Sequence, residues 1–221
     1  MRSYARAIDP DDERGIEAFR ADVEPWLPPK ADRSDDWRVV AAAPRVCTAF
    51  GTLPADVRAA ITPPVIELVE GMAAFVEDHA GTDGLRIDTR AELEEYCHYA
   101  AGTVGILITN LLTRKELAAD RRRTLYETAE SFGLLLQLVN IAKDVYDDYT
   151  DEHNVYLPAS WLTEEGVPQE AVIDERYRDS AAAVVSRTVA HARTFVDEAE
   201  RYLHAMPLRH GNTLAAWGVP F

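Results

Sequence analysis

The sequence has little lysine, few cysteines and no leader-like start. Only three of its 23 basic residues are lysine: Lys30, Lys115 and Lys143. Its two cysteines are too few for a disulfide framework and lack metal-ligand spacing. The N-terminus has no signal-peptide core, and no apolar run is long enough to span a bilayer. We therefore expect a cytoplasmic protein with reduced, buried thiols.

Positive charge is also scarce, because the chain carries a net charge of −15. This charge argues against nucleic-acid binding and against simple electrostatic docking on anionic lipid. An acidic surface with so little lysine is typical of proteins that work in high salt, which screens the self-repulsion. A GC-rich genome explains the arginine but not the acid excess, so the composition favours a halophilic protein.

Strand-like alternation is not convincing anywhere, whereas helical periodicity recurs through nearly the whole sequence. With 47% apolar residues among 221, the chain can form one large domain with its own core. We therefore expect a single all-α domain over residues 1–221. Its main helices are predicted at about 11–26, 35–50, from 55 onward, 89–112, 121–149 and 170–203. The apolar residues expected inside the last helix are Ala183, Val185, Val189, Ala192, Phe195 and Ala199.

The most informative segment spans residues 137–148. Read as a helix, it places four polar side chains on one face, at steps of three, four and four residues. They are Gln137, Asn140, Asp144 and Asp148. The helix is apolar around them, so the stripe is expected to face inward, where carboxylates are costly unless a metal or substrate satisfies them. Mg²⁺ takes one or two carboxylates and completes its shell with water and phosphate, so the stripe predicts a magnesium–diphosphate site.

A solvated face is the simpler explanation for two acids four residues apart, and for Asp144 and Asp148 alone it is the more common one. The stripe, however, continues as amides and not as the lysines that would form helix salt bridges. Asp147 and Asp151 add negative charge nearby, which is unfavourable without a cation. A metal site is therefore the better interpretation.

A second segment, residues 96–105, combines tyrosines with small residues. Tyr96 and Tyr99 can stabilise a developing positive charge through the ring face, or move a proton. Gly102 and Gly105 leave room beside the helix and cost helix propensity, so tight packing is expected there. From the spacing alone, a helix crossing with two core tyrosines is the more common explanation. His98 is expected to be a packed or surface histidine.

Three blocks together resemble the squalene/phytoene synthase family: residues 96–105, residues 137–148 and Tyr156-Leu157-Pro158. His98 makes the first block more similar to the squalene type than to the phytoene type. The resemblance covers essentially the whole chain. It implies an all-α isoprenoid-synthase helical bundle around a central cavity, with two aspartate-rich motifs on facing helices.

The resemblance also implies roles for the stripe. Asp144 and Asp148 match the family's second aspartate-rich motif, which holds Mg²⁺, or Mn²⁺ in its place, against a prenyl diphosphate. Gln137 and Asn140 match the amides just upstream, so they are expected to bind substrate. Lys143 stands where the family usually has arginine, which keeps the charge but loses the bidentate fork.

For the tyrosine block, the resemblance implies that Tyr96 handles a proton and stabilises a cation in the first half-reaction. Tyr99 is a second catalytic candidate. Gly102 and Gly105 are candidates for contact with substrate. These roles come from the family pattern, whereas spacing alone favours a structural crossing.

The implied reaction joins two farnesyl diphosphates through a cyclopropyl diphosphate, presqualene diphosphate, and then forms squalene with hydride from NADPH. A phytoene or dehydrosqualene synthase, which works without NADPH, is one alternative. A non-catalytic module that binds a prenyl lipid or a partner is the other. The protein is expected to be a monomer, with peripheral membrane contact for product release.

Two further departures from the family pattern affect these expectations. His153-Asn154 stands where the family usually has Gly-Arg, which puts a phosphate contact there in doubt. The first aspartate-rich motif should lie N-terminal to everything present, and Asp9-Pro10-Asp11-Asp12 cannot replace it because the proline interrupts any helical face. We therefore expect a chain truncated at both ends, with little or no turnover on its own.

Overall fold

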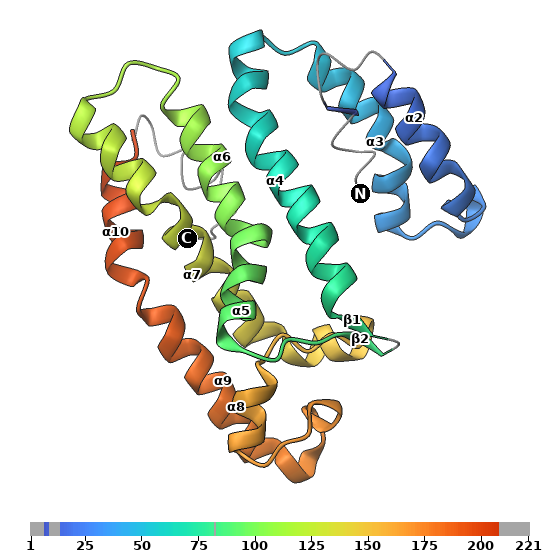
Figure 1. Cartoon of the computed structure of the whole chain (residues 1–221), viewed down its shortest axis with the longest axis vertical. Coiled ribbons are helices and arrows are strands. Elements are labelled where there is room, and N and C mark those ends of the chain that lie inside the picture. Colours follow the sequence, from blue (N-terminus) through green and yellow to red (C-terminus); the bar gives the residue numbers. More distant parts are fainter. Residues whose placement is uncertain (1–6, 9–13, 82, 208–221) are drawn as a thin grey trace. The chain divides into compact units, whose positions relative to one another are not determined.

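Helices form nearly the whole of the fold (Figure 1), which confirms the all-α prediction. The structure is a computed structural model of the chain and describes residues 7–8, 14–81 and 83–207. The segment Asp9-Pro10-Asp11-Asp12 lies outside the described residues. The chain divides into two compact units, residues 1–73 and 74–221, which are described one at a time. The expectation of a single domain stays a prediction.

Unit 1 contains α2 (Gly15–Val23), α3 (Asp35–Gly51) and most of α4 (Ala55–His79), with 3-10 turns at Glu24–Trp26 and Lys30–Asp32. The side chain of Ser34 caps α3 by accepting a hydrogen bond from the Trp37 N–H at 3.4 Å. Pro44 lies inside α3 without ending it. Phe19 and Cys47 belong to the core of this unit, and Cys47 is a free, buried thiol as predicted.

Helix α4 corrects one expectation from the sequence. Its 25 residues are long and apolar enough, by length and composition, to cross a membrane. Only 22% of its apolar window is buried. The helix continues through Pro63 and Pro64. The core helices of soluble proteins meet the same criteria, so length and composition alone do not place α4 in a bilayer.

Unit 2 is built on α7 (Ala119–Glu152), a helix of 34 residues. It packs against α5 (Arg90–Cys97), the π-helical segment η3 (His98–Gly102), α6 (Thr103–Leu112), α9 (Arg178–Arg193) and α10 (Val196–Ala205). Tyr202 of α10 stacks on Phe132 of α7, with ring centroids 5.0 Å apart. Its hydroxyl lies 2.9 Å from that of Thr109 on α6. One tyrosine therefore ties three helices together in the core.

Two predicted helices differ from the structure. The helix predicted at 89–112 is interrupted by the π-helical turn, and the one predicted at 170–203 begins at Arg178 and breaks between α9 and α10. The predicted inner face of α9 is wrong in part, because Ala183 and Val189 are exposed. Val184 and Thr188 are buried in their place. The Thr188 hydroxyl donates to the Val184 carbonyl at 3.1 Å, which satisfies a polar group in the core.

Two glycines allow α7 to cross η3 and α6 at backbone contact. A Cβ at Gly105 would overlap the carbonyl oxygen of Ala129, and a Cβ at Gly133 would overlap that of Ala101. The tight packing predicted near Gly105 is therefore confirmed, and its partner is the backbone of α7.

Short extended segments connect α4 to α5 and were not predicted. Strand β1 (Ala80–Gly81) pairs antiparallel with β2 (Gly84–Leu85). The chain after β2 then runs beside the segment that follows α7. Val155 donates its N–H to the Leu85 carbonyl at 3.0 Å, and Ala159 donates to that of Ile87 at 2.9 Å. These bonds hold the end of α7 to the start of α5.

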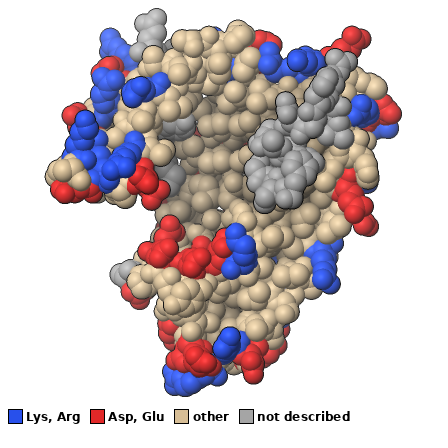
Figure 2. Space-filling view, turned by 180° about the vertical axis from the view of Figure 1, so that it is seen from behind, with Lys and Arg blue, Asp and Glu red and all other residues tan. Residues whose placement is uncertain are grey.

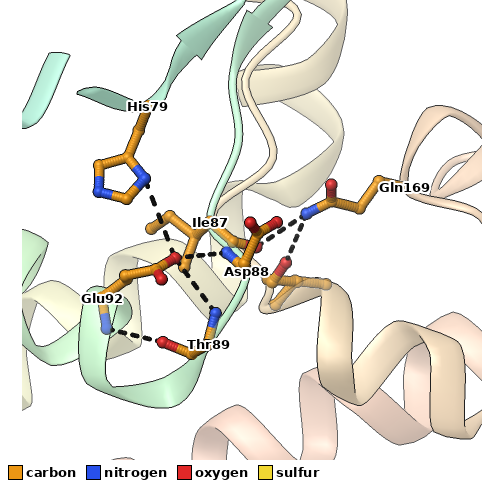
Figure 3. A network of polar contacts seen from close by, with 7 residues as sticks. His79, Ile87, Asp88, Thr89, Glu92 and Gln169 are labelled. Carbon is orange, nitrogen blue, oxygen red and sulfur yellow. Dashed lines mark hydrogen bonds and ion pairs between the residues drawn. The ribbon is translucent and has the colours of Figure 1, made fainter. Parts of the chain in front are cut away.

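A polar network closes this junction (Figure 3). The Glu92 carboxylate accepts hydrogen bonds from the backbone N–H groups of Asp88 at 2.7 Å and Thr89 at 3.3 Å. The Thr89 hydroxyl accepts one from the Glu92 N–H at 3.2 Å, which completes a capping box for α5. Gln169 donates to the Ile87 carbonyl at 2.9 Å. The network fixes the direction in which α5 begins.

A glycine series tests how closely β2 meets the end of α7. Gly84 has a φ of +97°, and a Cβ there would overlap the carbonyl of His153. We expect Gly84→Ala to lower the free energy of unfolding by at least about 2 kcal/mol, from left-handed strain plus overlap. Urea unfolding followed by circular dichroism measures this.

Two other glycines serve as controls that separate the effect of left-handed backbone strain from the effect of overlap with the His153 carbonyl. Gly166 has a φ of +71° but nothing within 4 Å of a Cβ, so Gly166→Ala is expected to cost only about 1 kcal/mol. Gly81 has no positive φ, and its nearest neighbour is 3.9 Å from a Cβ, so Gly81→Ala should change stability by less than about 0.5 kcal/mol. Equal losses in all three variants would contradict the close contact at Gly84.

Candidate functional site

The predicted polar stripe lies along the C-terminal half of α7, on residues Gln137, Asn140, Asp144 and Asp148. Asn140 is exposed, and the other three are half-buried. The fully buried positions of this stretch are Leu138 and Ile141. The expectation that the stripe faces inward is therefore right only in part, since it borders the core.

Asp148 is the most strongly perturbed carboxyl group of the stripe. Burial, together with the nearby carboxylates of Asp144, Glu152 and Asp147, raises its pKa to about 6. Lys143 Nζ lies 3.2 Å from Asp144 Oδ2, but both side chains are partly exposed, at 67% and 34%. Negative charge is therefore concentrated where desolvation already disfavours it.

The donor set around the stripe limits the kind of metal that would fit. Among the described residues, no group of three or more histidine, cysteine, aspartate or glutamate side chains lies close enough to hold a metal by itself. Asp144 and Asp148, one helical turn apart, supply two carboxylates at most. Such a pair suits Mg²⁺, which keeps several waters and takes phosphate oxygens, and it does not form a closed zinc or calcium cage.

Tyr96 lies at the end of α5 and is 8% exposed. Its ring stacks on that of Tyr156, with centroids 4.6 Å apart and planes at 28°, and Phe75 lies 5.6 Å away on α4. Burial raises the pKa of Tyr96 well above its usual value, and Tyr156 and Asp148 raise it further. The phenol therefore stays protonated at neutral pH, so it can donate a hydrogen bond but cannot act as a base.

Asp148 of the stripe and Tyr156 of the tyrosine pair line one tight crevice, which has about 0 Å³ of space for a water molecule. Its lining combines the end of α7 with the segment that follows it: Ile141, Val145, Asp148, Asn154, Val155, Tyr156 and Leu157. A larger hollow of about 910 Å³, at the other end of α7, contains none of the predicted site residues. The crevice is therefore where the predicted chemistry is brought together.

The remaining tyrosine-block residues lie on the π-helical turn, a feature often found at functional sites. Tyr99 is half-buried and donates to Glu95 Oε1 at 3.4 Å. His98 Nδ1 lies 2.7 Å from Glu130 Oε1, as expected for a packed histidine. A Cβ at Gly102 would come within 3.2 Å of the Glu130 side chain. Gly102 and Gly105 thus pack on α7, while their contact with substrate and the catalytic role of Tyr99 stay predictions.

Sequence reasoning missed three residues of this site. Tyr156 belongs to the Tyr-Leu-Pro block, but nothing in the spacing indicated that it meets Tyr96. Asn154 donates to the Tyr156 hydroxyl at 3.2 Å, and Glu152 accepts from Asn154 at 2.7 Å. Only Glu152 had a local signal, because it continues the carboxylate stripe four residues after Asp148.

The exposed surface of the protein carries both signs of charge. Figure 2 shows acidic and basic side chains next to each other on the face that it presents. Arg176 pairs with Asp174 at 2.6 Å, and Arg90 with Glu94 at 3.4 Å. Exposed pairs of this kind contribute little to stability, and the chain as a whole keeps its net charge of −15. Adaptation to high salt stays a prediction.

Comparisons with known proteins identify the family. The family model described as squalene/phytoene synthase matches residues 4–221. The chain is 33% identical over 149 residues to 15-cis-phytoene synthase of Enterobacter agglomerans, covering 67% of this chain and 45% of that protein. It is 30% identical over 138 residues to the chloroplastic phytoene synthase of Narcissus pseudonarcissus, covering 62% of this chain and 31% of that protein. The chain thus spans less than half the length of these relatives.

Solved structures share the fold. In the structure described as TcSQS with the ligand E5700, the matching chain has a TM-score of 0.70 and 23% sequence identity. The match covers 92% of this chain and 61% of that chain. A second structure, TcSQS with the ligand BPH1237, gives the same TM-score of 0.70. At this identity the likeness shows the helical fold alone.

The raised pKa of Asp148 predicts that Asp148→Asn stabilises the ligand-free chain at neutral pH. The folded-state value of about 6 lies above the ordinary 3.8, so the folded state binds this proton more tightly than the unfolded state does. Stability from this group is highest below about pH 4 and is lost as the pH rises to about 6. We expect a gain of about 1 kcal/mol at pH 7.5, after discounting for solvent screening, and none at pH 4.

Urea unfolding in EDTA at both pH values measures this effect. Asp151→Asn is the matched control, because Asp151 is an exposed carboxylate near the end of the same helix. It should leave stability unchanged at both pH values. An equal gain in both variants would assign the effect to net charge and not to the buried position of Asp148.

Proposed function

The chain belongs to the squalene/phytoene synthase family, and from this premise we propose that it carries part of the active site for the head-to-head condensation of two prenyl diphosphates. The observation that supports this best is the crevice shared by Asp148 and Tyr156, with Tyr96 stacked behind. A carboxylate pair beside tyrosine side chains whose hydroxyl groups keep their protons suits a reaction in which a diphosphate leaves and a carbocation forms.

Asp144 and Asp148 would hold Mg²⁺, or Mn²⁺, with water and diphosphate oxygens as the remaining ligands. The bound ion would offset the charge that develops on the leaving diphosphate. The crowding of negative charge that raises the pKa of Asp148 supports this assignment, because a cation would relieve it. Lys143 lies beside Asp144 and would meet phosphate as a point charge, without an arginine fork.

The other stripe residues would orient the substrate. Gln137 and Asn140 lie one to two turns before Asp144 on the same face of α7, so their amides can donate to diphosphate oxygens. The Tyr96 phenol, which stays protonated, can donate to a departing oxygen and present its ring face to a carbocation. Its stacked contact with Tyr156 also excludes water from that side.

We propose farnesyl diphosphate as the substrate and squalene as the product, because the first block has the squalene-type His98. Squalene formation would require NADPH as reductant, and we assign no described residue to that cofactor. The second candidate is a phytoene-type product formed without NADPH. The similarity to curated phytoene synthases favours it.

Metal-dependent diphosphate binding tests the carboxylate pair directly. We expect the chain to bind inorganic diphosphate in the presence of Mg²⁺ at high salt, and not after EDTA. Asp144→Asn and Asp148→Asn should each weaken binding at least about tenfold, because each removes one ligand charge. Isothermal titration calorimetry measures this. Asp151→Asn should bind like the wild type, and metal-independent binding by the wild type would reject the magnesium assignment.

Product analysis tests the reaction. The chain is incubated with farnesyl diphosphate and Mg²⁺ at high salt, with and without NADPH, and diphosphate release and hydrocarbon products are measured. Little or no release is expected from these 221 residues, because the described site supplies one carboxylate pair of a two-part clamp. Robust release would contradict that expectation. Where a hydrocarbon product is formed, squalene made only with NADPH supports the first candidate, and a product made without it supports the second.

A further inference from the structure

We infer that Asn154 is a positioning residue that holds the Tyr156 hydroxyl in place beside Tyr96. The inference deepens the proposed function and depends on it for its catalytic meaning. His153-Asn154 stands where the resemblance led us to expect Gly-Arg. From the sequence alone, His153-Asn154 indicated only that a contact to phosphate is in doubt. The inference gives Asn154 a role of its own.

The chain reaches Asn154 by a sharp stop of α7. His153 has a φ of 58°, the left-handed conformation that usually ends a helix at glycine. Its N–H donates to the Tyr149 carbonyl at 3.0 Å, and the Asn154 N–H donates to that of Asp148 at 3.0 Å. The backbone of Asn154 is therefore fixed to the same turn of α7 that carries the Asp148 carboxylate.

The side chain of Asn154 uses both ends of its amide. Oδ1 accepts a hydrogen bond from the Leu85 N–H at 2.8 Å. Nδ2 donates to Glu152 Oε2 at 2.7 Å and to the Tyr156 hydroxyl at 3.2 Å. A flipped amide would place its NH₂ group against the Leu85 N–H, so the Leu85 bond fixes which end faces the tyrosine.

This donation and the ring stack restrain Tyr156 in complementary ways. Stacking on Tyr96, at 4.6 Å between centroids, restrains the plane of the Tyr156 ring. The bond from Asn154 restrains the hydroxyl along that plane. It also occupies one acceptor position of the phenol oxygen, and the same hydroxyl shares a further hydrogen bond with the Tyr96 side chain. Asn154 thereby helps to fix where the Tyr156 hydroxyl lies relative to Tyr96.

A purely structural role for Asn154 is the competing explanation, and Gln169 provides its control. Gln169 Nε2 donates to the carbonyls of Ile87 at 2.9 Å and Leu157 at 3.4 Å. It therefore joins the same two segments as Asn154, but through backbone groups and not through a tyrosine hydroxyl (Figure 3). Loss of the Gln169 contacts should loosen the junction without removing a partner of Tyr156.

The experiment is NMR of the 221-residue chain with ¹³Cζ-labelled tyrosine, because this carbon senses hydrogen bonding at the hydroxyl. Tyr96→Phe and Tyr156→Phe assign the two signals. Asn154→Asp keeps an acceptor for Leu85 and removes the donor to Tyr156, so the Tyr156 signal should shift. Gln169→Glu, the same amide-to-acid change at the control position, should leave it in place.

A second measurement removes the Tyr156 hydroxyl and follows the side-chain NH₂ group of Asn154. In ¹⁵N-labelled Tyr156→Phe, the Asn154 side-chain NH₂ signals should move upfield and exchange faster with water, because they lose an acceptor. This arm stays informative if Asn154→Asp fails to fold. Equal movement of the Tyr156 signal in Asn154→Asp and Gln169→Glu, or an unchanged Asn154 NH₂ group in Tyr156→Phe, would overturn the inference.

The same samples keep this result separate from the proposed function. Binding of Mg²⁺ with inorganic diphosphate is measured on the wild-type chain by calorimetry. Absence of that binding rejects the proposed function, whereas the tyrosine and asparagine signals still report whether Asn154 holds Tyr156. Shifts limited to Asn154→Asp, together with diphosphate binding by the wild type, support both.

Discussion

Backbone contact between α7 and the η3–α6 segment is the constraint on which the second unit depends. Gly105 and Gly133 each leave no space for a Cβ against the other helix. Because no side chain separates the two backbones, α5 and α6 have little freedom to rotate about α7. Tyr96, just before the π-helical turn, is thereby kept beside Asp148 across the crevice. The space beside Gly105, which the sequence suggested was left for substrate, is instead filled by the backbone of α7.

Burial and neighbouring negative charge both disfavour the ionised form of Asp148. The fold keeps Asp148 half-buried among other carboxylates, which raises its pKa to about 6, and sets a phenol beside it that burial keeps protonated. At neutral pH only the carboxylate lowers the stability of the ligand-free fold, because the buried phenol is uncharged. Strong perturbation of two groups in a shared crevice is characteristic of functional sites, where a ligand supplies the missing compensation.

The parts of the fold that could be predicted depend on local periodicity. The stripe on α7 follows from helical spacing alone, and its residues share the predicted face. The inner face of α9 was misjudged because Val185 and Val189 suggested an apolar stripe. Thr188 is buried instead, since its hydroxyl bonds back to its own helix. The pairing of Leu85 with Asn154 depends on residues 69 positions apart, and no local pattern indicates such a contact.

Residues 153–154 show that a family pattern read from sequence can identify an unexpected residue but cannot indicate the contacts that this residue makes in the fold. Comparison with the pattern identified an arginine that is missing, and with it a contact to phosphate. In the fold, His153 takes the left-handed position suited to glycine, at a cost of about 1 kcal/mol. Asn154 anchors β2, the end of α7 and Tyr156 at once. Where the resemblance led us to expect a basic side chain, the fold therefore has an amide whose hydrogen bonds are internal.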